Sequence, residues 1–292
     1  MIKKPRYQWS EKEVEFLINH YSDNGLQYCS DKLNISKDIV VSRVQKLGLK
    51  VSPLRKLEAQ RNNSLKYKYP DEKLFLDLNR NDIAYIMGIM WSDGYLNNIT
   101  LSLESNKNDI DEIKNIFFDL GEWDYKESIE REKRKTLSSI SCHYGKILNI
   151  FEKYGYKEKS KIKPKFIDKL NNDKLMNYFL RGVIDGDGCF YINKKTNQTQ
   201  FSLAGSYNQD WDYFTEFLNK LNIKYTIKRK KVKKEGKIHK SSIVRITDRK
   251  DIIKLGDYIY IDYEIDKIGL KRKHTKYFDI KCIQQAREFP NK

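Results

Sequence analysis

The 292-residue sequence lacks the features that define several large protein classes. Its four cysteines are far apart with no CxxC pair, which argues against a disulfide framework and against a structural zinc site. No apolar run approaches the roughly 18 residues that a membrane span requires. The opening MIKKPRYQWS contains no apolar segment of a secretory signal. We therefore expect an intracellular, reduced protein, in a cytoplasm, an infected cell or an organelle.

Acidic residues are too few to balance the basic ones. The chain has 57 Lys and Arg against 40 Asp and Glu, so its formal net charge is +17. Such an excess favours a polyanionic partner, nucleic acid above all, over an ordinary acidic enzyme. The 20 tyrosines and 13 phenylalanines are sufficient for packed cores, and the length suits about two domains.

The first fifty residues predict a small helical unit. Ser10, with Glu13 three positions later, forms a capping box that starts a first helix. Gly25 separates this helix from a second one. Ser36 can cap a third helix, and Gly48 can end it.

Three short helices with tight turns in a basic chain are typical of a helix-turn-helix, in which the third helix reads DNA. The pattern resembles the small Trp-anchored helix-turn-helix modules fused to many phage and bacterial DNA enzymes. We predict such a domain over residues 1–50, with a helical protein-interaction module as the alternative. The candidate DNA-binding residues on the polar side of the third helix are Lys37, Ser42, Arg43, Gln45 and Lys46.

The stretch from 51 to 80 predicts a basic linker. It contains Pro53, Pro70 and a polar Asn-Asn-Ser run among several Lys and Arg residues. Such a tether could follow a phosphate backbone or serve only as a solvated connector.

Beyond residue 80 the sequence passes twice through the order helix, strand, strand, helix, strand, strand, helix. The first pass opens with NDIAYIMGIMWSDG and the second with KLMNYFLRGVIDGDG. Leu103 and Leu203 hold equivalent strand positions 100 residues apart. This internal repeat predicts an α+β fold of two αββαββα halves with pseudo-twofold symmetry, over 81–165 and 166–292, the second with a C-terminal helix. We expect a monomer.

The helix that opens each half carries small residues at every fourth position, and its other residues are mostly apolar. A stripe of small residues allows two helix backbones to approach closely, so we predict that these helices pack against each other. The residues of this predicted helix interface are Ala84, Gly88, Ser92, Gly182 and Gly186.

Each of these helices ends in an aspartate followed by glycine: Asp93 with Gly94, and Asp187 with Gly188. A carboxylate at a helix C-terminus is unfavourable because the helix dipole is already negative there. Two such acids brought together repel each other unless a cation lies between them, and Mg²⁺ is the usual choice beside phosphates. We therefore predict a site for two or more Mg²⁺ ions at Asp93, Asp187, Gly94 and Gly188.

The two segments resemble the two LAGLIDADG motifs of single-chain homing endonucleases. LRGVIDGDG is a close match, and IMGIMWSDG is looser, with Trp91 where the family often has its first acid. The family's catalytic acid is the last one before the terminal glycine, and Asp93 and Asp187 keep that position. The resemblance covers roughly residues 82–273 and includes the repeat order.

The resemblance implies that the two helices form the interface between half-domains and that the two sheets form a saddle over DNA. It implies metal-assisted phosphodiester hydrolysis with one acid for each active site. It also implies a basic residue near the phosphate, for which the repeat-related segments YKEKSK and LKRKHTK offer Lys159 and Lys273. In the run KYTIKRKKVKKEGKIHK, either a DNA-contacting or a solvated hairpin, the candidate DNA-binding residues are Lys228, Arg229 and Lys230.

The leading hypothesis is a site-specific DNA endonuclease that makes a metal-dependent staggered double-strand break in a long target. An intron maturase that binds intron RNA and a catalytically silent DNA-binding regulator are the alternatives. An intein is disfavoured, because no splicing-junction Cys or Ser stands at the start and no His-Asn at the end. Whether the enzyme is intron-encoded or free-standing stays open.

Overall fold

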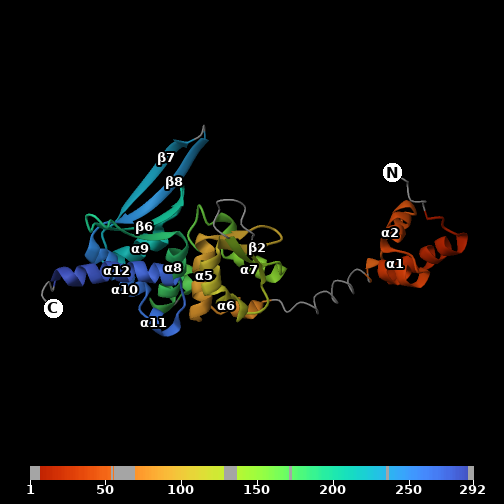
Figure 1. Cartoon of the computed structure of the whole chain (residues 1–292), viewed down its shortest axis with the longest axis horizontal. Coiled ribbons are helices and arrows are strands. Elements are labelled where there is room, and N and C mark those ends of the chain that lie inside the picture. Colours follow the sequence, from red (N-terminus) through yellow and green to blue (C-terminus); the bar gives the residue numbers. More distant parts are fainter. Residues whose placement is uncertain are drawn as a thin grey trace. The chain divides into compact units, whose positions relative to one another are not determined.

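The computed structural model describes residues 7–53, 55, 70–127, 137–170, 173–234 and 237–288. Its contacts divide the chain into two compact units, Met1–Lys68 and Tyr69–Lys292 (Figure 1). None of the helices in the described residues is both long enough and apolar enough to cross a membrane.

The N-terminal unit contains the predicted helices. α1 (Glu11–Leu33) begins at the capping box, in which Ser10 and Glu13 bond each other's backbone amides. Gly25, with φ 76° and ψ −175°, interrupts α1, so the assigned helix consists of two helical stretches. With α2 (Lys37–Lys46), these stretches make up the expected three helices. Their own small core consists of Leu17, Cys29, Ile35, Val40 and Val44.

The predicted linker is shorter than 51–80. Residues 54 and 56–69 lie outside the described residues, but a short helix, α4 (Glu72–Leu76), follows them. Its Phe75 is fully buried, with ring contacts to Trp123 and Phe151. The segment from about residue 71 therefore belongs to the first half. The prediction missed it because a helix of five residues is too short to show a helical period.

The second unit repeats one order of elements, as predicted. In the first half this order is α5 (Asn81–Ser92), β1 (Gly94–Leu96), β2 (Leu101–Asn106), α6 (Lys107–Phe118), β3 (Asp124–Glu127), β4 (Leu137–Cys142) and α7 (Gly145–Lys153). In the second half it is α8 (Asp173–Asp187), β5 (Gly188–Ile192), β6 (Thr199–Ser206), α9 (Asp212–Lys220), β7 (Thr226–Lys234), β8 (Lys237–Ile246) and α10 (Arg249–Ile259).

Four short or terminal elements complete the unit. They are η1 (Tyr156–Glu158), η2 (Ile167–Lys169), α11 (Tyr263–Asp266) and α12 (Lys271–Glu288). α12 is the predicted C-terminal helix, and it contacts α10 and β5 of the second half. Tyr277 and Ile280 are its most buried apolar residues.

The two sheets have the same topology. Both are antiparallel and four-stranded, in the orders β1-β2-β4-β3 and β5-β6-β8-β7. Their registers also correspond, because Gly94 pairs with Leu103 and Gly188 with Leu203. The sequence repeat is therefore a structural repeat.

One apolar core extends through both halves, with α5 and α8 packed against each other between them (Figure 1). One face of each sheet faces this core. Leu103 and Ile140 from the first sheet and Phe201 and Val244 from the second are at most 1% exposed. The opposite face of each sheet is open. The predicted functional residues of this unit lie at the ends of α5 and α8 and on the β7–β8 hairpin.

Candidate active site

α5 and α8 approach so closely that glycine is required on both. A Cβ at Gly88 would lie 1.9 Å from the carbonyl oxygen of Phe179, and one at Gly182 would lie 2.3 Å from that of Tyr85. Separations under 3 Å are closer than real Cβ contacts, so these positions exclude a side chain. The predicted helix interface thus has the close backbone contact that a stripe of small residues permits.

The other predicted interface residues also lie in this region. A Cβ at Gly186 would lie 2.0 Å from the Oγ of Ser92, so these two residues meet near the helix ends. Ala84 is fully buried in the core beside them.

The packing brings the two acids to the same end of the helix pair. Asp93 is the C-cap of α5, and Asp187 is the last residue of α8. The carboxyl carbon of Asp93 lies 3.2 Å from the position of a Cβ on Gly186, next to Asp187 in the chain. Burial, together with the charge of Asp93, raises the pKa of Asp187 to about 6. Surrounding protein also raises the pKa of Asp93, although its side chain stays open to solvent on one side.

The glycine after each acid allows a strand to leave the helix at once. A Cβ at Gly94 would lie 2.4 Å from the carbonyl oxygen of Met90, and one at Gly188 would lie 2.5 Å from that of Ile184. Each Asp-Gly pair therefore fixes where its acid stands relative to both the helix and the sheet.

A lysine caps the C-terminus of each helix. The Nζ of Lys159 donates to the carbonyl oxygens of Ser92 and Gly94, each at 2.6 Å. The Nζ of Lys273 donates to the carbonyl oxygens of Gly188 and, at 3.4 Å, of Ile184. The last carbonyls of a helix have no partner within it, so an ammonium group satisfies them and offsets the negative end of the dipole.

The charges of the two acids and the two lysines affect one another's pKa values. The positive charges of Lys159 and Lys273 act on both Asp93 and Asp187 and oppose the rise in their pKa values. Burial lowers the pKa of Lys159 to about 8, against the opposing effect of the two acids. Burial likewise lowers the pKa of Lys273. All four predicted catalytic residues thus come together in one place.

The predicted metal-binding residues lie at the ends of the two packed helices. The carbonyl groups of Gly94 and Gly188 are hydrogen-bonded to the two lysines, and the Asp93 carboxylate is near enough for its charge to raise the pKa of Asp187. No cluster of three or more His, Cys, Asp or Glu with metal-binding geometry occurs among the described residues.

The two halves differ at the motif's first acid. In the second half, the fully buried Asp185 accepts hydrogen bonds from the hydroxyls of Tyr85 and Tyr260, each at 3.0 Å, and from the amide of Leu270 at 2.8 Å. Trp91 holds the equivalent position in the first half and packs edge-on against Tyr156. The first half is therefore apolar where the second half holds a carboxylate.

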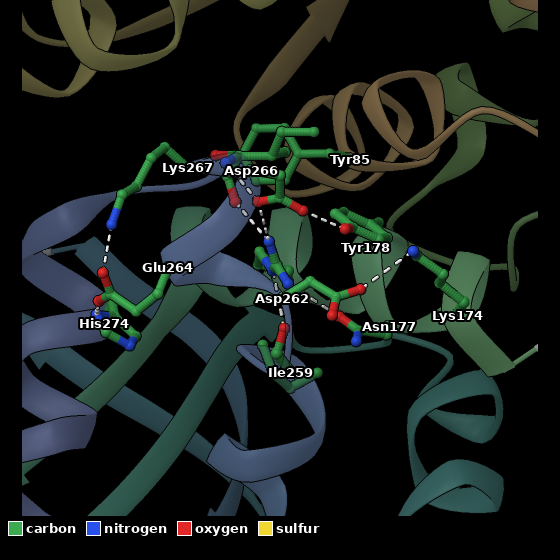
Figure 2. Close-up of polar contacts among 12 residues, drawn as sticks. Tyr85, Lys174, Asn177, Tyr178, Ile259, Asp262, Glu264, Asp266, Lys267 and His274 are labelled. Atoms are coloured by element: carbon green, nitrogen blue, oxygen red, sulfur yellow. Dashed lines mark hydrogen bonds and ion pairs between the residues drawn. The ribbon is translucent and has the colours of Figure 1, made fainter.

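A buried arginine stabilises the second half. Arg181 of α8 is 0% exposed and donates to the carbonyl oxygens of Ile259 and Ile268 at 2.8 and 2.7 Å. It also pairs with Asp266, which accepts a bond from Tyr178 (Figure 2). Sequence reasoning missed this network, although a charged residue within the otherwise apolar run FLRGVI was a signal for it.

The basic hairpin divides its residues between two faces. Lys228 and Lys230 lie opposite Ile243 and Ser241 on the open face of the second sheet. Arg229 lies on the other face, opposite the buried Ser242, and its Nε donates to the Tyr207 carbonyl at 3.1 Å. The hairpin extends beyond the helices of its half (Figure 1).

The predicted DNA-binding residues of the N-terminal unit lie on α2. Lys37, Ser42, Gln45 and Lys46 are exposed. Arg43 is half-buried, with its guanidinium 6.0 Å from the centre of the Trp9 ring.

Comparison with known proteins agrees with the resemblance seen in the sequence. Residues 174–260 match the sequence family described as the LAGLIDADG-like domain, a span that runs from α8 through α10. The second half of the chain therefore carries a LAGLIDADG-like domain. An uncharacterized protein of Methanocaldococcus jannaschii is 27% identical over 185 residues, which are 57% of this chain and 67% of that protein.

Solved structures with a similar arrangement include homing endonucleases and a further LAGLIDADG protein. The homing endonuclease I-WcaI bound to its DNA recognition sequence gives a TM-score of 0.43 at 15% identity, over 78% of this chain and 95% of that one. I-DmoI in complex with DNA and Ca gives 0.41 at 13% identity, over 61% and 88%. Full-length DUF199/WhiA from Thermatoga maritima gives 0.41 at 16% identity, over 71% and 68%.

Proposed function

We propose that this chain, which carries a LAGLIDADG-like domain, is a site-specific DNA endonuclease that makes a metal-dependent staggered double-strand break in a long target. One observation supports this most. Each half contributes one acid and one lysine, and Asp93, Asp187, Lys159 and Lys273 meet at the ends of two packed helices. Two acidic and two positively charged side chains in a pseudo-twofold arrangement suit the two strands of a duplex.

The acids suit a hard divalent cation. Burial and the charge of Asp93 raise the pKa of Asp187 in spite of the two lysines, so a further positive charge beside the ionised pair would be favourable. Mg²⁺ usually binds one or two carboxylates and takes its other ligands from water and substrate phosphates, so two carboxylates are enough. When bound, such an ion would polarise the scissile phosphate and lower the pKa of the attacking water. Asp93 and Asp187 would hold it.

The lysines would supply fixed positive charge to the reaction. Lys159 and Lys273 are already held by backbone carbonyls at the helix ends. Because they need no reorganisation, they would stabilise the charge that develops on the phosphate in the transition state. The partly buried surroundings strengthen this effect, since the local dielectric constant is lower than that of water.

The open faces of the two sheets would contact the DNA. Lys228, Lys230 and Arg245 point from the open face of the second sheet, where they would bind phosphates or base edges. The N-terminal unit would lengthen the contacted site as a helix-turn-helix domain, through α2. Mg²⁺ is the expected cofactor, double-stranded DNA the expected partner, and a monomer the expected state.

A cleavage selection tests the proposal. The full chain would be incubated with a randomised or genomic DNA library and Mg²⁺, beside Asp93→Asn and Asp187→Asn. Discrete staggered cuts that either substitution abolishes or reduces to nicks would support the endonuclease. Salt-sensitive DNA binding without cutting, under any divalent cation, would contradict it and favour a regulator. Preferential binding to a structured intron RNA would favour a maturase.

A further inference from the structure

The backbone that carries each active-site lysine is bonded to the opposite half of the molecule. In the first half, the carbonyl oxygen of Lys159 accepts a hydrogen bond of 2.8 Å from the Nε2 of Gln209. The carbonyl of the next residue, Ser160, accepts one of 2.8 Å from the hydroxyl of Ser206. Both residues belong to the second half. Ser206 is the last residue of β6, and Gln209 lies just after this strand.

In the other direction, residues of the first half contact the segment that carries Lys273. Arg272, next to Lys273, donates from Nε and Nη2 to both carboxylate oxygens of Asp109, each at 2.6 Å. The amide of Lys271 donates to Glu112 at 2.9 Å. Asp109 and Glu112 lie on α6 of the first half. A two-bonded arginine–carboxylate pair is both strong and directional, so it fixes the start of α12.

The two contacts come from equivalent positions of the repeat. Asp109 follows β2 by the same number of residues as Gln209 follows β6. The strands β2 and β6 also pair with β1 and β5 in the same register. Their chemistry differs, yet each reaches the segment that carries the other half's lysine. An aspartate that is 3% exposed is costly to bury, and Arg272 offsets this cost.

We propose that Asp109 and Gln209 are positioning residues, each of which sets the lysine of the opposite half through the backbone segment that carries it. This inference rests on the proposed endonuclease. Lys159 and Lys273 each contact carbonyl oxygens at a helix end, so a small shift of their backbone would move the ammonium group away from its helix. Displacements of about 1 Å can reduce a rate by a factor of about 100.

The first test uses lysine reactivity in the full chain without DNA. An amine-labelling reagent with mass spectrometry would report the labelling rate of each lysine in Gln209→Leu and in Asp109→Asn. We expect Gln209→Leu to increase labelling of Lys159 several-fold and leave Lys273 protected, and Asp109→Asn to do the reverse. Uniform labelling of both lysines in each variant, or no change in either, would overturn the inference.

Matched controls separate positioning from general loosening. Asp251→Asn removes a carboxylate from the third residue of α10, the same helix position that Asp109 holds in α6, but away from either lysine. Gln198→Leu makes the glutamine substitution at an exposed position in the loop between β5 and β6. Neither control should change the labelling of Lys159 or Lys273. Asp109→Glu, which keeps the carboxylate, should restore most of the protection of Lys273.

The second test measures cutting of each strand. On a duplex recovered by the wild-type cleavage selection, with each strand labelled separately, Gln209→Leu should slow the strand that Lys159→Met slows, by about tenfold. Asp109→Asn should slow the strand that Lys273→Met slows. Equal loss on both strands would overturn the inference. If the wild type cuts no DNA, the proposed function fails, and the labelling pattern still decides whether Asp109 and Gln209 position the lysines.

Discussion

Gly182 of α8 packs directly against the backbone of Tyr85 in α5, where a Cβ would lie 2.3 Å from the Tyr85 carbonyl oxygen and 2.5 Å from the Ile89 amide nitrogen. Neither obstacle is a flexible side chain, so the helices would have to separate to admit even a methyl group. This contact holds the two halves in the arrangement that brings Asp93 and Asp187 together.

Gly182→Ala should therefore destabilise the second unit by about 3 kcal/mol, although alanine is the better helix former. Chemical denaturation followed by circular dichroism would measure the change. Gly145→Ala is the matched control, because a Cβ there meets nothing within 4 Å. We expect it to shift stability by less than about 1 kcal/mol. Equal effects of the two substitutions would show that the helices can separate freely.

Asp187 should make the protein less stable at neutral pH than at acid pH. Its unfolded carboxyl ionises near pH 3.8 and its folded carboxyl near pH 6, so the folded state binds the extra proton between these values. Stability from this group is thus present below about pH 4 and lost as the pH rises through 6. Asp187→Asn should raise the free energy of unfolding by about 2 kcal/mol at pH 7 and by little at pH 4. Thermal unfolding at both pH values would show this, and a variant less stable at pH 7 would contradict it.

Divalent cations should offset the loss of stability that ionised Asp187 causes at pH 7 in the wild type. Addition of Mg²⁺ or Ca²⁺ without DNA should raise the unfolding temperature at pH 7, since an ion bound only by the folded state stabilises it. The increase should be smaller in Asp93→Asn and smaller again when Asp187→Asn is added. Gln198→Leu, far from the acids in the fold, should respond as the wild type does. Identical shifts in all four proteins would mean that the cation does not bind at Asp93 and Asp187.

Cleavage of one strand should fall at alkaline pH. Burial lowers the pKa of Lys159 to about 8, so its ammonium group is present below that pH and lost above it. The strand that Lys159→Met slows should therefore be cut progressively more slowly above pH 8. Lys159→Arg keeps its charge throughout this range, so any remaining activity should not decline there. Single-strand rates between pH 7 and 10 would test this. A decline above pH 8 in Lys159→Arg as steep as that of the wild type would count against it.

The open face of the β7–β8 hairpin should bind DNA through its charge. Replacing Lys228 and Lys230 together by Gln should weaken binding and reduce the slope of log affinity against log salt by about 2, as expected when two phosphate contacts are lost. Lys220 and Lys250 lie exposed on α9 and α10, away from the open face, so the same double change there should leave the slope unaltered. Filter binding across a salt series would compare them. Equal slopes in both double variants would place the DNA elsewhere.

The sequence by itself determined the repeat, the two sheets, the helix ends and the two acids. These follow from local patterns: apolar periodicity within each helix and strand, small residues at every fourth position, and an Asp-Gly at each helix end. The family resemblance implied a basic residue in each active site, and the repeat supplied Lys159 and Lys273 as candidates at equivalent positions. The N-terminal helices followed from a capping box and a glycine, which act within a few residues.

Only the tertiary structure decided which distant residues meet. Arg272 and Asp109 are 163 positions apart, and Gln209 and Lys159 are 50 apart, so no local pattern links them. The network of Arg181 and the placement of Arg229 on the opposite face from Lys228 and Lys230 likewise depend on which side of a sheet or helix the core occupies. A contact between distant segments is set by how the halves pack together, and packing depends on the shapes of all the surfaces involved rather than on the period of any one segment.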